Sequence, residues 1–329
     1  MIMKIIEQRS VGPLGELFLA SLRGRDDLLI EFVDTVEPAV PKDKKWVMMI
    51  STQFGCPIGC AFCDAGALEY KGNLSAEEML AQIDHIVARE RTMNVKTHPK
   101  LKIHFARMGE PTLNPAALDA LRLLGQRYPH PGIMASLSTV APDAQPTERF
   151  LEGLIAVKDR YFSGGRFQMQ FSVHATKAQE REEIVPVKTW DFGRIADYGR
   201  RFVVPGDRKV TLNFAVAPTS DLDADAIIES FDVEKFLIKI TPINPTAKAK
   251  ATGLEHVWFS APEPIAAWQQ RLKSAGFDVI LSPSEACEIE AETSCGQLWA
   301  RVLKKEAVTA RLTSPTSDSR TFSCVKGAP

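Results

Sequence analysis

The sequence has no apolar run of the roughly 18 residues that a membrane span requires. Its first ten residues include Lys4, Glu7 and Arg9 and lack the apolar centre of a secretory signal. We therefore expect a cytoplasmic protein with no membrane partner. An excess of charge is also absent, because 40 Lys and Arg face 41 Asp and Glu in the 329 residues. This balance argues against polyanion binding through bulk charge and leaves a local basic surface open.

Cysteine is scarce, since six residues in a chain of 329 are too few for a disulfide scaffold. Their distribution is uneven. Cys56, Cys60 and Cys63 fall within eight residues, whereas Cys287, Cys295 and Cys324 lie near the other end of the chain. Such clustering predicts a metal or iron–sulfur site on the first group.

Most of the chain alternates β-branched apolar runs with amphipathic stretches, which is typical of βα units and a parallel sheet. Ser75 with Glu78 and Asn114 with Pro115 have the spacing of helix starts. Six parallel strands with outer helices fit a partial (β/α)6 barrel or a doubly wound sheet, and both place active-site loops after the strands. The predicted strands are Lys45–Thr52, Lys102–Arg107, Ile133–Val140, Phe167–His174, Val210–Ala217 and Phe236–Thr241.

The two ends of the chain differ from this alternating part. Residues 1–44 predict a small β appendage, built on a hairpin of Glu16–Leu22 and Leu28–Val33. Residues 307–329 are polar and rich in Ser and Thr, which predicts a loosely held tail. The expected organisation is therefore an appendage, a barrel at 45–306 and a tail.

Cys56, Cys60 and Cys63 form a C-x-x-x-C-x-x-C motif directly after the first predicted barrel strand. Three thiolates on one short loop can bind three irons of a [4Fe–4S] cluster and leave the fourth iron without a protein ligand. An open iron suits a cluster that coordinates a substrate or cofactor. The alternative is a structural zinc site, in which a His or Cys295 would complete a tetrahedral set.

The spacing of these cysteines and the aromatic Phe62 before Cys63 resemble the radical S-adenosylmethionine (SAM) enzymes. Further motifs narrow the resemblance to the RlmN/Cfr RNA methyltransferases, because they occur in the same order over about three-quarters of the chain. They are STQFGC at 51–56, MGEPTLN at 108–114, LSTV at 137–140, SVHA at 172–175, PINP at 242–245 and CGQL at 295–298. The resemblance implies an α/β fold with a partial (β/α)6 barrel of the radical SAM type.

The resemblance also implies the cofactors, a [4Fe–4S] cluster on Cys56, Cys60 and Cys63 and SAM bound to its open iron. An electron from the cluster cleaves SAM to methionine and a 5′-deoxyadenosyl radical, so the implied partner is a reductant such as flavodoxin or ferredoxin. Gly109 and Glu110 would meet the ammonium of SAM in a charge-assisted contact. The implied SAM contacts at loops and strand ends are Phe62, Gly109, Glu110, Ser138, Ser172 and Asn244. His174 fits a core role as well as a functional one.

By the same resemblance, Cys295 is the catalytic methyl carrier. In the RlmN/Cfr enzymes one SAM methylates a cysteine near the C-terminus, and the radical from a second SAM takes hydrogen from that methyl group before the carbon is added to an adenine of ribosomal RNA. A further family cysteine, seven residues before the first cluster cysteine, releases the product, and here that position is Met49. Methionine cannot act as a general base, so release must differ. Cys287 and Cys324 are the candidate substitutes.

Two enzyme functions are therefore open. In the first, methylated Cys295 delivers a one-carbon unit to an unreactive carbon, on an RNA or on a smaller molecule. In the second, only hydrogen abstraction from a small molecule or peptide remains. The 44 residues before the barrel leave too little room for the helical module that RlmN and Cfr carry there, which also puts ribosomal RNA in question. The retained CGQL motif favours the first function. An iron–sulfur regulatory protein without turnover is the non-enzyme alternative.

Overall fold

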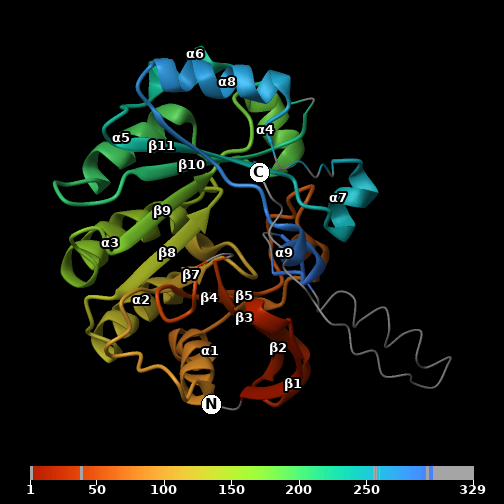
Figure 1. The fold of residues 1–329 in the computed structure, drawn as a ribbon, viewed down its shortest axis with the longest axis vertical. Coiled ribbons are helices and arrows are strands. Elements are labelled where there is room, and N and C mark those ends of the chain that lie inside the picture. The colour runs from red at the N-terminus through yellow and green to blue at the C-terminus, as the bar shows by residue number, and fades with distance from the viewer. Residues whose placement is uncertain are drawn as a thin grey trace.

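The structure is a computed structural model that describes residues 3–298 except 38, 39, 219, 255, 257, 259, 294 and 295. Its centre is one sheet in the order β1-β2-β3-β4-β7-β8-β9-β10-β11-β12 (Figure 1). From β4 onward neighbouring strands are parallel. These strands are β4 (Trp46–Ile50), β7 (Leu101–Phe105), β8 (Ile133–Thr139), β9 (Phe167–Ser172), β10 (Val210–Val216), β11 (Phe236–Pro242) and β12 (Asp278–Leu281). The predicted α/β class is confirmed.

Helices connect the parallel strands, and α1, α2, α3, α5 and α8 lie on the outer side of the sheet (Figure 1). The helices are α1 (Ala76–Arg89), α2 (Pro115–Arg127), α3 (Gln145–Tyr161), α4 (Ala178–Ile184), α5 (Phe192–Phe202), α6 (Ala224–Ser230), α7 (Ala247–Thr252), α8 (Glu263–Ser274) and α9 (Ala286–Glu290). A capping box of Ser75 and Glu78 begins α1, and Asn114 caps α2 before Pro115, which confirms both predicted starts. None of the described helices has the length and apolar character that a membrane crossing needs.

The two faces of the parallel sheet differ in polarity, because successive side chains of a strand point to opposite faces. On the outer face, Ile103, Leu137 and Phe214 are fully buried in the core that the helices complete. The inner face carries polar side chains, most of which keep part of their surface accessible. They are Lys102, His104, Ser136, Ser138, Gln168, Gln170, Ser172, Asn213 and Lys239. This polar inner face is the surface on which a substrate can lie.

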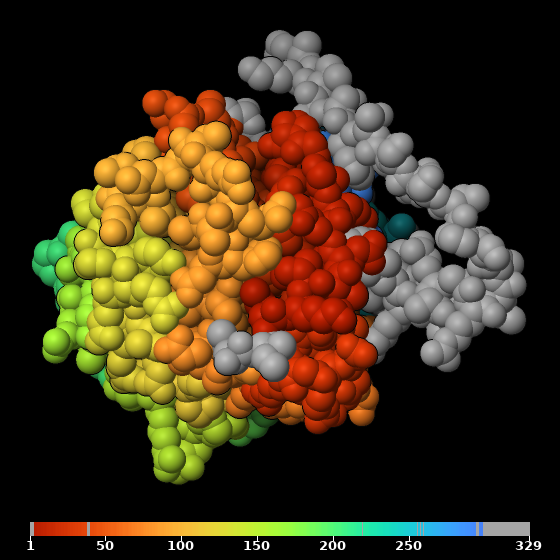
Figure 2. Space-filling model, turned by 90° about the horizontal axis from the view of Figure 1, so that it is seen from below, coloured from red at the N-terminus to blue at the C-terminus, as the bar shows by residue number. Residues whose placement is uncertain are grey.

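Three antiparallel strands extend the sheet beyond β4, namely β1 (Met3–Ser10), β2 (Gly15–Leu22) and β3 (Arg25–Val36). β3 joins the barrel strands by pairing with β4, where Val33 lies opposite Met49. The extension, red in Figure 2, packs against the orange segment that contains α1. The rings of Phe18 and His85 meet edge to face there, with centroids 5.1 Å apart. The division of the chain at residues 44 and 306 stays a prediction, and residues 307–329 lie outside the described part.

Candidate active site

The cysteine loop follows β4, β5 (Gln53–Phe54) and a sharp turn, and it leads into a short 3-10 helix, η2 (Asp64–Ala67). β5 pairs with β6 (Gly72–Asn73), which closes the base of the loop. Segments distant in sequence fix its backbone with hydrogen bonds from Ala61 N to Ile184 O (2.8 Å), from Lys248 Nζ to Gly59 O (2.6 Å) and from Thr246 Oγ1 to Phe62 O (2.6 Å). The loop is therefore held in one shape by α4, α7 and the residue before α7.

The three thiols of this loop are partly accessible, and none of them forms a disulfide bond. Burial raises the pKa of Cys56 to about 12 and that of Cys60 well above its ordinary value, and the neighbouring thiols raise both further. Thiolates in this place need a positively charged partner, which an iron cluster supplies. Within the described chain, no three His, Cys, Asp or Glu side chains converge as a single metal ion would require. Three thiols on one short loop, fixed by the hydrogen bonds described above, are the donor set that a [4Fe–4S] cluster with one open iron requires.

Gly109 brings the backbone after β7 against the segment that leads into the cysteine loop. Its φ is +102°, and a Cβ there would lie 2.7 Å from both Gln53 Cβ and Thr52 Oγ1. Hydrogen bonds join the same two segments, from Thr52 N to Met108 O (2.8 Å) and from Glu110 N to Gln53 Oε1 (2.8 Å). Glycine is therefore required at this position, where two of the predicted motifs meet.

The carboxylate of Glu110 is buried and already accepts four hydrogen bonds. The donors are Thr112 N (3.1 Å), Thr112 Oγ1 (2.7 Å), Thr139 Oγ1 (2.6 Å) and Val140 N (3.0 Å). Burial raises the pKa of Glu110, and these hydrogen bonds oppose that rise. Three of these donors reach Oε1 and one reaches Oε2, so Glu110 joins the loops after β7 and β8. Each carboxylate oxygen has about two acceptor positions, and one position on Oε2 is left by these four hydrogen bonds. Its contact with the ammonium of SAM stays a prediction.

The other predicted SAM contacts lie at or just beyond the carboxyl ends of strands, where the ends of parallel strands meet. Ser138 is near the end of β8, and its Oγ is 2.9 Å from His104 Nε2. Ser172 is the last residue of β9 and is partly accessible. Asn244 follows β11 and is buried, and its carbonyl accepts a hydrogen bond from Thr246 N at 2.7 Å. The fold thus brings these residues to the same edge of the sheet as the cysteine loop.

Phe62 and His174 are neighbours, with ring centroids 5.0 Å apart and rings nearly perpendicular. Burial lowers the pKa of His174 to about 3, with a smaller contribution from Arg181. Its Nδ1 accepts a hydrogen bond from Ala215 N at 3.1 Å, so the ring is neutral with its proton on Nε2. His174 therefore supports Phe62 and the backbone of β10.

Gly296 and Leu298, which follow Cys295, pack against the cysteine loop. Cys295 itself is outside the described residues. Asp64 N donates a hydrogen bond to Gly296 O at 3.0 Å. A Cβ on Gly296 would be 3.6 Å from Phe62 O and 3.8 Å from Cys63 Cα. Leu298 is buried with Ala65 and Met108, and two cluster cysteines pack against the same group. The CGQL motif therefore ends beside the predicted cluster ligands.

Met49, at the position of the missing family cysteine, lies in β4 between Val33 and His104. It packs against an apolar group that includes Leu19 and Cys287 of α9. Cys287 is buried and disulfide-bonded, unlike the cluster cysteines. Of the two candidate substitutes for the release cysteine, Cys287 thus lies near Met49, and Cys324 falls outside the described residues.

Sequence reasoning missed the residues that support this site. Thr139 holds Glu110, and Thr246 holds Phe62 and also caps α7. Thr139 lies inside the LSTV motif and could have been noticed there. Thr246 directly follows the PINP motif, but nothing in its local sequence indicates a contact with a loop that is 184 positions away.

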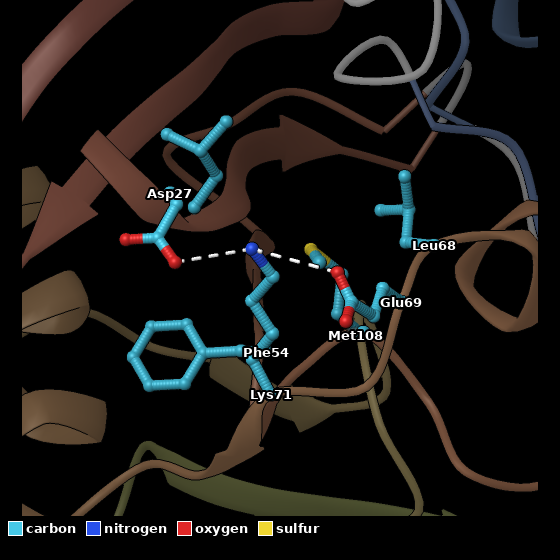
Figure 3. Close-up of a pocket in the computed structure, with 8 residues that line it drawn as sticks. Asp27, Phe54, Leu68, Glu69, Lys71 and Met108 are labelled. Atoms are coloured by element: carbon cyan, nitrogen blue, oxygen red, sulfur yellow. Dashed lines mark hydrogen bonds and ion pairs between the residues drawn. The ribbon is translucent and has the colours of Figure 1, made fainter. Parts of the chain in front are cut away.

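A separate pocket lies between the extension and the cysteine loop (Figure 3). Lys71 crosses it, with Nζ 3.1 Å from Asp27 Oδ2 and 3.6 Å from Glu69 Oε2. Phe54, Gly55, Leu29, Leu68 and Met108 complete the lining. The pocket touches the MGEPTLN motif only through Met108, the residue before Gly109. None of the predicted cofactor residues lines it.

Comparison with known proteins supplies the family. No protein-family model matches the chain. The chain is 28% identical over 302 residues to a probable dual-specificity RNA methyltransferase RlmN from Prochlorococcus marinus (strain MIT 9515), which covers 89% of this chain and 79% of that relative. It is 27% identical over 268 residues to the dual-specificity RNA methyltransferase RlmN of Solidesulfovibrio magneticus, covering 79% of this chain and 70% of the relative. The chain is an RlmN/Cfr-like radical SAM enzyme of the methyltransferase type. The predicted resemblance to the RlmN/Cfr-like enzymes is confirmed.

A solved structure agrees with the fold of this radical SAM enzyme. The crystal structure of a radical SAM methyltransferase from Sphaerobacter thermophilus matches it with a TM-score of 0.66 and 22% identity, covering 91% of this chain and 81% of the other. The predicted partial barrel is thereby confirmed. Membership of this superfamily implies SAM and a [4Fe–4S] cluster as cofactors, and the donor set on the cysteine loop fits that cluster.

Proposed function

We propose that Cys56, Cys60 and Cys63 hold the cluster and that the enzyme transfers a methyl-derived carbon through Cys295 to an unreactive carbon of its substrate. When bound, the cluster supplies the electron that cleaves SAM to methionine and a 5′-deoxyadenosyl radical. The observation that supports the proposal is the hydrogen bond from Asp64 N, directly after Cys63, to the carbonyl oxygen of Gly296, the residue after Cys295. A methyl carrier must lie where the radical forms, and this segment ends there.

The chain's own residues would bind and enclose SAM. The backbone at Gly109 and the carboxylate of Glu110 would receive its ammonium, and Ser138, Ser172 and Asn244 would hydrogen-bond its ribose or its methionine part. Apolar side chains exclude water around the thiols, because Ile58, Val140 and Val185 form a buried group against which Cys56 and Cys60 pack. Such exclusion protects a reactive radical from side reactions.

The names of the relatives support a proposal for the substrate, and the electron needed for SAM cleavage supports a proposal for the partner. Since these are named dual-specificity RNA methyltransferases, we propose an RNA or a smaller molecule that presents an unreactive carbon, and a cytoplasmic reductant such as flavodoxin or ferredoxin. Product release would not use residue 49, because Met49 has no acidic proton. Cys287 lies in the same apolar group and would have to be reduced before acting as a thiol.

Met49 also favours a second candidate function, hydrogen abstraction from a small molecule or peptide without methylation. The titratable side chain opposite Met49 is His104. Burial lowers its pKa well below the ordinary value, and its Nε2 is bonded to Ser138 Oγ. Because of this low pKa, His104 is a weak base at physiological pH and a poor replacement for the thiol at residue 49.

Mass spectrometry of the purified enzyme separates the two candidates. Protein expressed with a SAM supply should carry one added methyl group on the peptide that contains Cys295. Cys295→Ala should remove this methyl group and keep the SAM cleavage that yields 5′-deoxyadenosine. An unmodified Cys295, together with full activity of Cys295→Ala on the substrate, would establish hydrogen abstraction instead.

A further inference from the structure

The inner face of the sheet has a positively charged end that neither the cysteine loop nor the predicted SAM contacts use. Lys102 on β7 and Lys239 on β11 point to this face, while Lys45, Lys100 and Arg208 lie at the amino ends of β4, β7 and β10. Burial, followed by the charges of these four neighbours, lowers the pKa of Lys102 to about 7. The charged groups that act on Lys102 are therefore all cations.

Two carboxylates lie near these cations, but they act on Lys45 and Lys239 and not on Lys102. Glu37 forms an ion pair with Lys45. Glu288 of α9 faces Lys239, and burial raises the pKa of Glu288 while the charge of Lys239 opposes that rise. Lys102 makes no ion pair and no hydrogen bond within the described chain. A partly buried ammonium without a partner is costly, and a bound anion would remove that cost.

A second observation is independent of charge. Ser136 is 1% exposed, and its Oγ has no hydrogen-bond partner in the described structure. Buried hydroxyl groups are nearly always hydrogen-bonded. Ser136 lies opposite His104, two residues after Lys102, so all three side chains are on the inner face. On the neighbouring strand β9, Gln168 lies opposite Ser136, so its amide is on the inner face as well.

We propose that Lys102, Ser136 and Gln168 hold a phosphate group of the substrate on this inner face. The inference rests on the proposed function, because the same face leads up to the strand ends where SAM would lie. Neighbouring strands are about 5 Å apart, and residues two apart along a strand about 7 Å, so the three side chains can reach one tetrahedral group. Donors from three strands around a single lysine suit phosphate, whereas a planar carboxylate is matched best by the fork of an arginine.

Trace labelling of lysines on the full-length enzyme tests this site. Acetic anhydride at about pH 7.5 reacts with unprotonated amines, and a nearby anion raises the pKa of a lysine by about one to two units. Inorganic phosphate should therefore reduce the labelling of Lys102, measured on its peptide by mass spectrometry, by about three- to twentyfold. Lys209, which pairs with Asp278 at 2.6 Å, is the matched control and should not change. Ser136→Ala should weaken the protection without altering the labelling in the absence of phosphate.

Two further arms identify the source of the anion. Methyl phosphate should protect Lys102 as inorganic phosphate does, and acetate at equal ionic strength should not. No protection, equal protection by acetate, or protection by inorganic phosphate alone would each overturn the assignment to a substrate phosphate. Because the labelling requires neither SAM cleavage nor methylation, its failure leaves the role of Cys295 standing. An unmethylated Cys295 would likewise leave the labelling result unchanged.

Discussion

Arg107 and Glu31 form an ion pair that is almost completely buried, with 3% and 0% of their side chains exposed. Arg107 Nε lies 2.8 Å from Glu31 Oε1, and the same guanidinium donates a hydrogen bond to Glu292 O at 2.8 Å. One side chain thus ties β3 and the end of β7 to the turn after α9. This turn precedes Cys295, so the pair fixes the start of the segment that carries the predicted methyl carrier.

The first prediction concerns this pair. Glu31→Gln should lower the free energy of unfolding by about 3–5 kcal/mol, because it leaves the buried charge of Arg107 without its partner. Urea unfolding followed by circular dichroism measures the change. Glu77→Gln is the control, since it breaks an exposed pair with Arg127 and should change stability by less than about 1 kcal/mol. Equal effects of the two substitutions would show that the buried pair is not a structural tie.

The second prediction concerns the cluster. Cys60→Ala should remove bound iron and sulfide after anaerobic reconstitution and abolish formation of 5′-deoxyadenosine, because two thiolates cannot hold a site-differentiated [4Fe–4S] cluster. Iron and sulfide analysis with chromatography of the nucleoside measures both. Cys324→Ala should retain both. Zinc bound in place of iron in the unaltered protein, with the fold intact, would refute the cluster assignment.

The third prediction separates the two roles of Glu110. Glu110→Ala should weaken SAM binding and leave the iron content unchanged, because we propose that this carboxylate contacts SAM and because its observed partners lie in the loops after β7 and β8. It should also lower stability by about 1–3 kcal/mol, since Thr139 and Val140 N lose a buried acceptor. Equilibrium dialysis and iron analysis measure the first effect. Loss of iron in this variant would assign Glu110 to the cluster loop instead.

The fourth prediction concerns product release. Met49→Cys should speed the release of any covalent adduct between Cys295 and the substrate, because it restores the thiol that the family uses at this position. Quenched single-turnover samples, analysed by mass spectrometry of the intact protein, follow the adduct. Met49→Leu keeps the apolar contact with Val33 and is the control. An adduct that decays equally fast in all three proteins would show that release does not depend on residue 49.

The fifth prediction is a pH dependence of stability. The pKa of His174 is about 3 when folded and 6.5 in an exposed chain. Between these values the unfolded state binds a proton that the folded state does not, so His174 makes stability rise with pH by about 1.4 kcal/mol per unit and has no such effect above that range. His174→Asn should flatten this slope in urea titrations from pH 4 to pH 6, a window chosen inside those pKa limits. His130→Asn is the control, and an unchanged slope in His174→Asn would refute the assignment.

Local sequence patterns predicted most strands and helices of the barrel, but not its last strand or its short helices. The starts of α1 and α2 were predictable because Ser75 and Asn114 act within their own helix turn. β12 was not, because it has four residues and its side chains are exposed or partly exposed. Its stability comes from pairing with β11. The short helices α4, α7 and α9 were missed for the same reason, since tertiary contacts rather than periodicity hold them.

The candidate site divides in a similar way. Cys56 and Gly109 could be predicted from motifs, because the residues of one loop also lie close together in sequence. The residues that hold these loops in place could not be predicted from motifs. Arg107 and Glu31 are 76 positions apart, and Thr246 and Phe62 are 184 apart. Only the closure of the chain into the sheet brings each of these pairs together.

The pairing of β3 with β4 has a consequence for access to the inner face. In a closed barrel the first parallel strand would hydrogen-bond with the last one. Here the outer edge of β4 is already occupied by β3, from Val33 opposite Met49 to Val36 opposite Trp46. The described sheet therefore ends at β1 on one side and at β12 on the other. Because β1 and β12 do not pair in the described sheet, no hydrogen bonds between these two strands would have to break for a ligand to reach the inner face from that side.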